Sequence, residues 1–327
     1  MISDKRFIGT ILIFLVVAIC ALLLTFSISN YIQLVFIIAV TAMSFTFAWL
    51  SERKVTPIPF KDSNFKKDIV IMLIFFGLIM LVRFFGYWQD YIFAEKACTI
   101  ALTISSIVLI DRSSTKYFGI QFRKPLFQIL WIIMALVIIW LGFTLYRFGL
   151  PLILGSQSTG MIVELPTFDL NFFVYALTML LWNFSEELFF RGYVLTKLEQ
   201  STNFWIALLI SSGLFGLYHV NYIISYHGTD PVGYILSYIM FCSMFGIGMG
   251  LLYKLTKSVL TTTIVHAFWN LFFSPRYLVP KIYINYGQTA FPLADFDYIF
   301  AIIFFIGIML AFYAAEKRKA RRCGYAI

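Results

Sequence analysis

Long runs of apolar residues, separated by polar segments, account for most of the chain. A helix needs about 20 mostly apolar residues to cross the hydrocarbon of a bilayer, so these runs predict membrane helices. Two of them, Ala97 to Ile110 and Ser258 to Phe273, are short and are expected to be tilted, half-buried or re-entrant. The sequence predicts an all-α, polytopic transmembrane bundle of about ten membrane helices. Its runs are Phe7 to Ser27, Tyr31 to Leu50, Ile69 to Trp88, Ala97 to Ile110, Pro125 to Arg147, Asn171 to about Leu198, Asn203 to His219, Val232 to Tyr253, Ser258 to Phe273 and Tyr298 to Ala315.

The composition supports this assignment, because 61% of the residues are hydrophobic and only 13% are charged. Soluble domains are about 25% charged. We therefore expect an integral protein of the lipid bilayer, in the cell (plasma) membrane. The two longest outer segments, Pro151 to Asp169 and Ser274 to Asp297, are expected to be connecting loops.

The net charge of +9 is explained by where the basic residues fall in this topology. With the N-terminus in the cytoplasm, all but five of the 25 Lys and Arg residues lie on cytoplasmic segments. Both termini are therefore expected to be cytoplasmic. Contact with anionic lipid headgroups accounts for the charge, and no nucleic-acid partner is expected. The five remaining basic residues, near outer helix ends or in outer loops, are Arg83, Lys96, Arg147, Arg276 and Lys281.

Two adjacent carboxylates and an arginine interrupt the sixth run, in the stretch W-N-F-S-E-E-L-F-F-R. A charge well inside the bilayer costs about 2.5–3.5 kcal/mol, so such residues need a partner or a function. On a helix, Glu187 and Arg191 are four residues apart and can form an ion pair, whereas Glu186 points about 100° away. Glu187 is expected to be structural and Glu186 to be available for chemistry. A purely structural Glu-Glu-Arg network is the alternative.

In the seventh run, a histidine follows an aromatic residue by one helical turn, at Phe215 and His219. At this spacing the aromatic ring packs against the imidazole. If the sixth and seventh helices form an antiparallel hairpin about Thr202 and Asn203, Glu186 and His219 lie at similar depth. A carboxylate and an imidazole that converge in a wet pocket can activate a water for hydrolysis.

The ninth run places His266 and Asn270 one turn apart on one helix face. Two side-chain donors aimed at one point are what an oxyanion hole requires. A structural hydrogen bond across the bundle is the alternative for this pair.

The three motifs E-E-x-x-x-R, F-x-x-x-H and H-x-x-x-N, in this order, resemble those of the CPBP (CAAX protease and bacteriocin-processing) intramembrane proteases. The Ras-converting CAAX prenyl endopeptidase belongs to that family. The resemblance covers residues 171–273 and implies a membrane endopeptidase with its catalytic core there. The apolar runs predict five helices before it, in 1–170, and a loop, a last helix and a basic tail after it, in 274–327. The implied roles are water activation by Glu186 and His219, oxyanion stabilisation by His266 and Asn270, and support of the site by Glu187, Arg191 and Phe215.

No metal or other cofactor is expected. Two carboxylates and two histidines fit zinc in principle, but the chain lacks H-E-x-x-H and each polar group already has a role in water activation. The expected partner is a membrane-associated peptide or protein substrate, which enters from the cytoplasm or the inner leaflet to a site in the cytoplasmic half. The sequence does not decide between prenylated proteins and peptide precursors, nor does it give the oligomeric state.

Two other functional classes stay open on the sequence alone. One is a proton-coupled transporter that uses Glu186 and His219 as a relay through the bundle. The other is a non-catalytic membrane scaffold or bacteriocin-immunity protein with the same helices. A Glu186→Gln change separates the three classes. It is expected to abolish proteolysis in a protease, to impair proton coupling in a transporter, and to leave partner binding largely intact in a scaffold.

Overall fold

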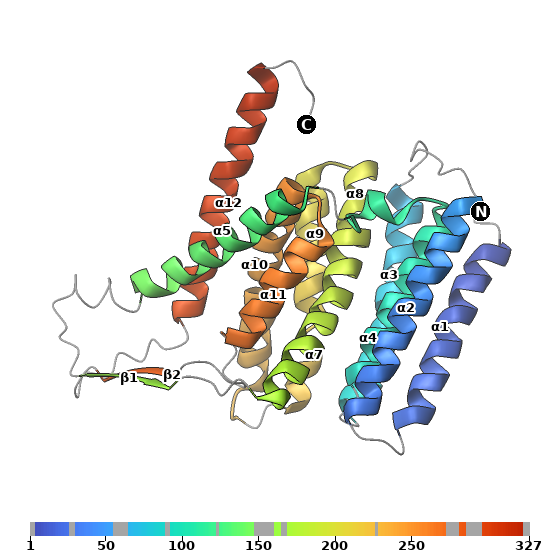
Figure 1. Cartoon of the computed structure of the whole chain (residues 1–327), viewed down its shortest axis with the longest axis horizontal. Coiled ribbons are helices and arrows are strands. Elements are labelled where there is room, and N and C mark those ends of the chain that lie inside the picture. The colour runs from blue at the N-terminus through green and yellow to red at the C-terminus, as the bar shows by residue number, and fades with distance from the viewer. Residues whose placement is uncertain are drawn as a thin grey trace.

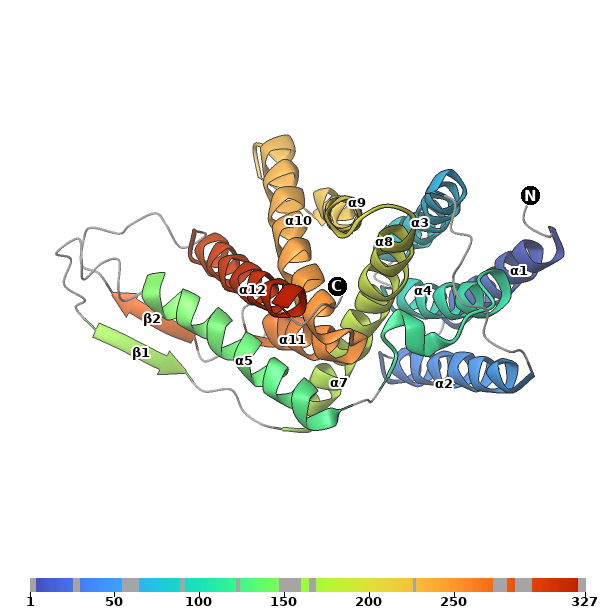
Figure 2. The same ribbon diagram turned by 90° about the horizontal axis from the view of Figure 1, so that it is seen from above.

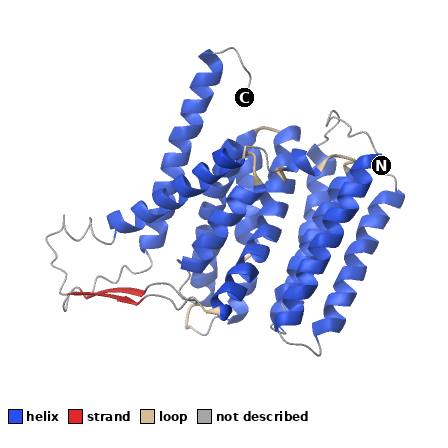
Figure 3. Ribbon diagram, viewed as in Figure 1, coloured by secondary structure: helices blue, strands red, loops and turns tan. Residues whose placement is uncertain are grey.

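The computed structural model describes residues 4–25, 30–54, 65–88, 92–121, 124–146, 160–164, 169–225, 228–272, 281–285 and 296–322. Nearly all of these residues are helical (Figure 3). Two helices continue as π-helices, α4 as η1 (Ser106–Ile110) and α7 as η4 (Leu188–Leu195). The α-helices are α1 (Asp4–Thr25), α2 (Asn30–Lys54), α3 (Phe65–Trp88), α4 (Ile92–Ser105), α5 (Pro125–Thr144), α7 (Leu170–Glu187), α8 (Thr196–Ser201), α9 (Phe204–Leu217), α10 (Pro231–Thr256), α11 (Val259–Phe272) and α12 (Phe296–Arg322). Two short 3-10 helices are η2 (Thr115–Phe118) and η5 (Val220–Ser225).

Seven helical segments of the described chain are long and apolar enough to cross a membrane. They lie in α2, α3, α4 with η1, α5, α9 with η5, α10 and α12. The predicted polytopic helical bundle is therefore confirmed. The expected spans in α1, α7 and α11 are not among these segments of the described chain. The 14 residues of α11 extend over about 21 Å at 1.5 Å per residue, which is shorter than the hydrocarbon core and agrees with the short ninth run.

The helices lie side by side in three groups (Figure 1 and Figure 2). α1 to α4 form one side, α7, α9, α10 and α11 form the middle, and α5 packs with α12 on the other side. α4 links the first two groups, because it packs against α1, α2 and α3 and also against α7. The start of α1 and the end of α12 both lie toward the upper side of Figure 1.

The continuous helical segment formed by α7, η4 and α8 turns back into α9 at Thr202 and Asn203. Asn203 is the N-cap of α9, and its side-chain oxygen accepts hydrogen bonds from the N–H groups of Trp205 and Ile206. Such a cap satisfies backbone donors that have no partner inside the helix. The predicted hairpin about these two residues is therefore confirmed.

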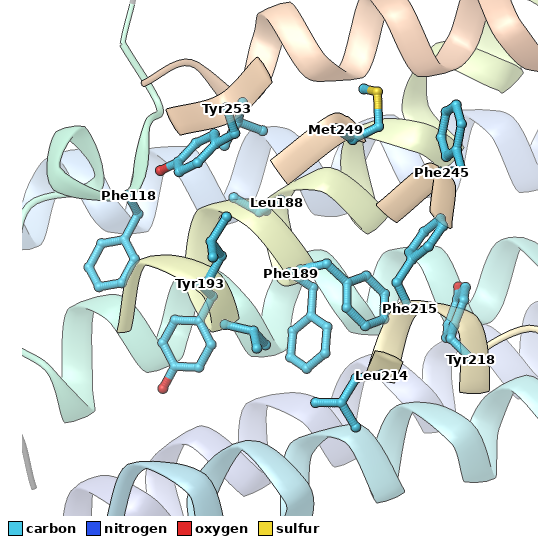
Figure 4. Packing of buried hydrophobic residues seen from close by; sticks show 14 of the residues in the cluster. Phe118, Leu188, Phe189, Tyr193, Leu214, Phe215, Tyr218, Phe245, Met249 and Tyr253 are labelled. Carbon is cyan, nitrogen blue, oxygen red and sulfur yellow. The ribbon is translucent and has the colours of Figure 1, made fainter. Parts of the chain in front are cut away.

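α9 and α10 approach each other closely at glycines. A Cβ atom at Gly216 would lie 2.5 Å from the carbonyl oxygen of Ile239, and one at Gly246 would lie 3.1 Å from the Cα atom of Ser212. Small residues at such positions let membrane helices pack backbone against backbone. Figure 4 shows buried hydrophobic side chains of the core, among them Phe189, Tyr193, Phe215, Phe245 and Met249.

The described chain also contains a two-stranded antiparallel sheet, formed by β1 (Gly160–Glu164) and β2 (Lys281–Asn285), with Gly160 opposite Asn285. The strands lie in the two segments that the sequence analysis expected to be plain connecting loops. Most other residues of those segments lie outside the described part. The pairing joins the connection that precedes α7 to the connection that follows α11, to one side of the helices (Figure 1).

Candidate active site

Glu187 is fully buried and lies between two partners. Its Oε1 atom is 3.0 Å from Nη1 of Arg191 and 2.8 Å from Nδ1 of His266. The predicted ion pair between Glu187 and Arg191 is therefore confirmed. An imidazole nitrogen that faces a carboxylate carries a proton, so Nδ1 of His266 is the donor of this hydrogen bond. Its other nitrogen, Nε2, lies 4.0 Å from Oε2 of Glu186.

Glu186 has a partner that the helix periodicity did not reveal. Its Oε1 atom lies 2.5 Å from Nζ of Lys96, which comes from α4. Glu186 is therefore not paired with Arg191, as the helix spacing predicts, but with a cation from another helix. A pattern along one helix shows only the neighbours on that helix, and Lys96 is 90 residues away in the sequence.

A network of buried charges extends from Lys96 to the end of α3. Arg83 lies 3.2 Å from Glu95, which is also 3.1 Å from Lys96. The hydroxyl of Tyr218 donates to Glu95 at 2.6 Å, and Arg83 donates to Asn221 at 2.9 Å. All five of these residues are buried.

These network residues were missed as site residues, although a signal for them was present. Lys96 falls outside the fourth run because hydropathy alone ends a membrane helix at a charged residue, and Arg83 falls near the outer end of the third run. The fourth run was accordingly started at Ala97, whereas α4 begins at Ile92 and includes Glu95. Three ionisable residues beside two apolar runs point to a buried polar cluster by themselves.

His219 lies just after α9, where its Nδ1 atom is 2.8 Å from the carbonyl oxygen of Phe215. The Phe215 ring lies 4.8 Å from the His219 ring and 5.8 Å from the His266 ring, between centroids. The predicted packing of the aromatic ring against the imidazole is confirmed. Figure 4 shows Phe215 between Phe245 and Tyr218. The two imidazoles therefore flank one aromatic ring.

Asn270 is held by α7. Its Nδ2 atom donates to Oδ1 of Asn183 at 2.7 Å, and Asn183 in turn donates to the carbonyl oxygen of Met179 at 2.6 Å. Asn183 is buried and lies one turn before Glu186 and Glu187. The sequence pattern gives no signal for Asn183, since an asparagine in an apolar run carries no charge.

The cluster lies in the half of the bundle that is opposite the chain ends. Trp182 packs against Phe93 in the first turn of α4, with ring centroids 5.5 Å apart, and Glu186 follows one turn later. At the other end, Lys197 pairs with Asp111, which follows η1, and it lies about three turns beyond Glu186. The site therefore lies nearer to the start of α4 than to the Lys197–Asp111 pair.

Residues 168–272 match the family model of type II CAAX prenyl endopeptidase Rce1-like proteins. This segment relates the chain to the CPBP-family CAAX proteases. The resemblance recognised in the three motifs is thereby confirmed. No curated protein and no solved structure matches the chain. The Rce1-like segment holds every predicted site residue, whereas Arg83, Glu95 and Lys96 lie outside it.

Proposed function

We propose that the chain is an intramembrane glutamate-type endopeptidase that hydrolyses peptide bonds of membrane-associated proteins or peptides with an activated water. The main support is the position of Oε2 of Glu186 and Nε2 of His266, 4.0 Å apart within the Rce1-like segment. A bridging water fits this gap, because it reaches both atoms at hydrogen-bond distances of about 2.7–3.0 Å.

In this proposal Glu186 accepts a proton from the water while the water oxygen attacks the carbonyl carbon of the substrate. His219 assists as a second acceptor. Its Nδ1 atom is engaged by the Phe215 carbonyl oxygen, so in the neutral ring the lone pair is on Nε2. General-base assistance of this kind contributes about 100- to 10,000-fold in rate.

His266 and Asn270 stabilise the negative oxygen of the tetrahedral intermediate. Because Nδ1 of His266 donates to Glu187, Nε2 donates a hydrogen bond only when the ring is protonated. Glu187 stabilises that imidazolium, as the carboxylate of a Ser-His-Asp triad does. Asn183 holds the amide of Asn270 in place. One oxyanion donor contributes about 100- to 1,000-fold in rate.

We also propose that the reaction requires no metal. Each carboxylate of the site already has a cationic partner, Lys96 for Glu186 and Arg191 for Glu187, and zinc would have to displace these buried ion pairs. Purified, active protein is expected to keep its activity in the presence of a chelator. Loss of activity that zinc restores would contradict the metal-free mechanism.

For the location, we propose the plasma membrane with both termini in the cytoplasm, as the distribution of Lys and Arg indicates. The proposed substrate is a membrane-associated peptide or protein. Labelling of a single cysteine at the N-terminus with a membrane-impermeant reagent tests the orientation. Modification of this cysteine in intact cells would show that the N-terminus lies outside the cell and would contradict the proposed orientation.

The decisive experiment compares cells that express the wild-type protein with cells that express Glu186→Gln. Uncleaved membrane peptides, identified by mass spectrometry, are expected to accumulate only with the variant. An accumulated peptide, synthesised and supplied to purified protein, is expected to be cleaved at least about 100-fold more slowly by Glu186→Gln. The matched control is Glu199→Gln, because Glu199 pairs with Lys254 and Lys257 away from the site.

The result also separates the other functional classes. Ion-dependent substrate flux without cleavage would indicate a transporter. Partner binding that survives Glu186→Gln, with no peptide accumulation, would indicate a scaffold. Either result would overturn the proposed peptidase activity.

A further inference from the structure

We propose that Lys96, which lies outside the Rce1-like segment, is a positioning residue that orients Glu186 for catalysis. This inference rests on the proposed function. The proposal gives the N-terminal helices a role in the site, because α4 supplies Lys96. α3 supplies Arg83, which pairs with Glu95, and Glu95 in turn contacts Lys96.

The ammonium group of Lys96 is fixed by three acceptors from three parts of the chain. Its Nζ atom lies 2.5 Å from Oε1 of Glu186, 2.5 Å from the hydroxyl of Tyr218 and 3.1 Å from Oε2 of Glu95. An ammonium group has three N–H donors, so all of them are used. The side chain is 1% exposed, so bulk water does not reach it.

These contacts determine which oxygen of Glu186 is available for chemistry. Lys96 engages Oε1, and the other oxygen, Oε2, is the atom that faces Nε2 of His266. A carboxylate that is anchored at one oxygen presents the second in a defined direction. Positioning within a few tenths of an ångström is what a catalytic group requires.

Lys96 is in turn held rigidly by its neighbours. The carboxylate of Glu95 accepts from Arg83 as well as from the Tyr218 hydroxyl. The guanidinium of Arg83 stacks over the Tyr218 ring, with its Cζ atom 3.7 Å from the ring centroid. The network therefore connects α3 and α4 to the residue that precedes His219.

The four charges of the network balance, because the cations of Arg83 and Lys96 face the carboxylates of Glu95 and Glu186. Charge balance alone does not determine which oxygen of Glu186 is engaged, whereas the contact with Lys96 does. The contact with Glu186 adds a cation to the proposed base and favours its ionised form at neutral pH. The groups that face Lys96 are Glu95 on α4, Glu186 on α7 and Tyr218 after α9, with Arg83 and His266 one contact further.

The test measures the pH dependence of kcat and KM for Lys96→Met and Lys96→Arg, on a peptide that the wild-type protein cleaves. Lys96→Met is expected to lower kcat at least tenfold and to move the acidic limb of the pH profile to higher pH. A buried carboxylate that has lost its cation binds a proton more readily. Lys96→Arg is expected to keep the acidic limb in place and to lower kcat severalfold, because a planar guanidinium cannot reproduce the three contacts.

Lys197→Met is the matched control, because Lys197 is also a buried lysine paired with carboxylates, those of Asp68 and Asp111, at the other end of the bundle. It is expected to lower stability without changing the pH profile. Folding of each variant is checked by size-exclusion chromatography and thermal unfolding. If Lys96→Met does not fold, the kinetics of Lys96→Arg provide the test. Values of kcat and KM for Lys96→Arg that equal those of the wild-type protein would overturn the positioning role.

A pH profile and kcat of Lys96→Met that match those of Lys197→Met would also overturn the inference, while the peptidase function would stand. Absence of cleavage by the wild-type protein on every accumulated peptide would instead overturn the proposed function, and the inference with it. The positioning role of Lys96 is supported if Lys96→Met lowers kcat and shifts the acidic limb of the pH profile while Lys197→Met does neither.

Discussion

Removal of Arg191 tests how strongly the buried charges of the site depend on one another. The side chains of Arg191 and Glu187 are 1% and 0% exposed, and their charged atoms lie 3.0 Å apart. The guanidinium also lies over the Phe215 ring, 4.3 Å from its centroid. In Arg191→Met an apolar side chain is kept while the cation that pairs with Glu187 is lost.

The expected cost follows from the burial. Removing one partner of a buried ion pair leaves a charge without compensation and costs about 3–5 kcal/mol. His266 remains 2.8 Å from Glu187 and offsets part of this cost only if its ring is protonated. Glu187→Gln is expected to cost a similar amount, because it leaves Arg191 with a carbonyl contact to Gly246 at 3.5 Å.

The double variant Arg191→Met/Glu187→Gln removes both charges together. Since replacement of a whole buried pair by uncharged residues is often close to neutral, its cost is expected to be smaller than the sum of the single costs by at least about 2 kcal/mol. Unfolding in mixed micelles, followed by circular dichroism, measures all four proteins. Lys254→Met is the control for a more exposed pair and is expected to cost less than about 1 kcal/mol.

Additive costs of the two single variants would refute this account. They would show that Glu187 and Arg191 are stabilised independently, by other groups or by water. Single costs below about 1 kcal/mol would also refute it, because such values are typical of exposed ion pairs.

Two further predictions concern packing and pH. Gly216→Ala is expected to lower the free energy of unfolding by about 1–3 kcal/mol, because its Cβ atom would lie 2.5 Å from the Ile239 carbonyl oxygen. Gly213→Ala is the control, because the space at its Cβ position is open. Equal unfolding temperatures of the two variants would contradict the close contact. Burial raises the pKa of the Asp111 carboxyl, against the charge of Lys197, so the folded protein binds this proton at higher pH than the unfolded chain does. The ionised form therefore disfavours folding above that pKa, and this penalty disappears as the pH falls. The difference in unfolding temperature between Asp111→Asn and the wild-type protein is expected to shift in favour of the variant from pH 5 to pH 8, and the opposite trend would contradict the assignment.

The helical architecture and the three motifs were accessible from the sequence. The apolar runs predict helices because every backbone group must be satisfied inside a bilayer, and this constraint acts on each segment separately. The Glu187–Arg191 pair and the packing of Phe215 on His219 follow from the spacing of four residues on one helix. The hairpin at Asn203 likewise depends only on local capping chemistry.

Contacts between distant helices were decided by the tertiary structure. No periodicity relates Lys96 to Glu186 or Asn183 to Asn270, since each pair joins helices that are far apart in the sequence. Charges that are expensive in lipid become tolerable only when another helix supplies a partner, and helix packing determines which one does. The pairing of β1 with β2 and the depth of the site depend in the same way on how the helices assemble. The sequence by itself determined the elements and the chemistry within each helix, and the packing of α4 against α7 decided how that chemistry is joined into one site.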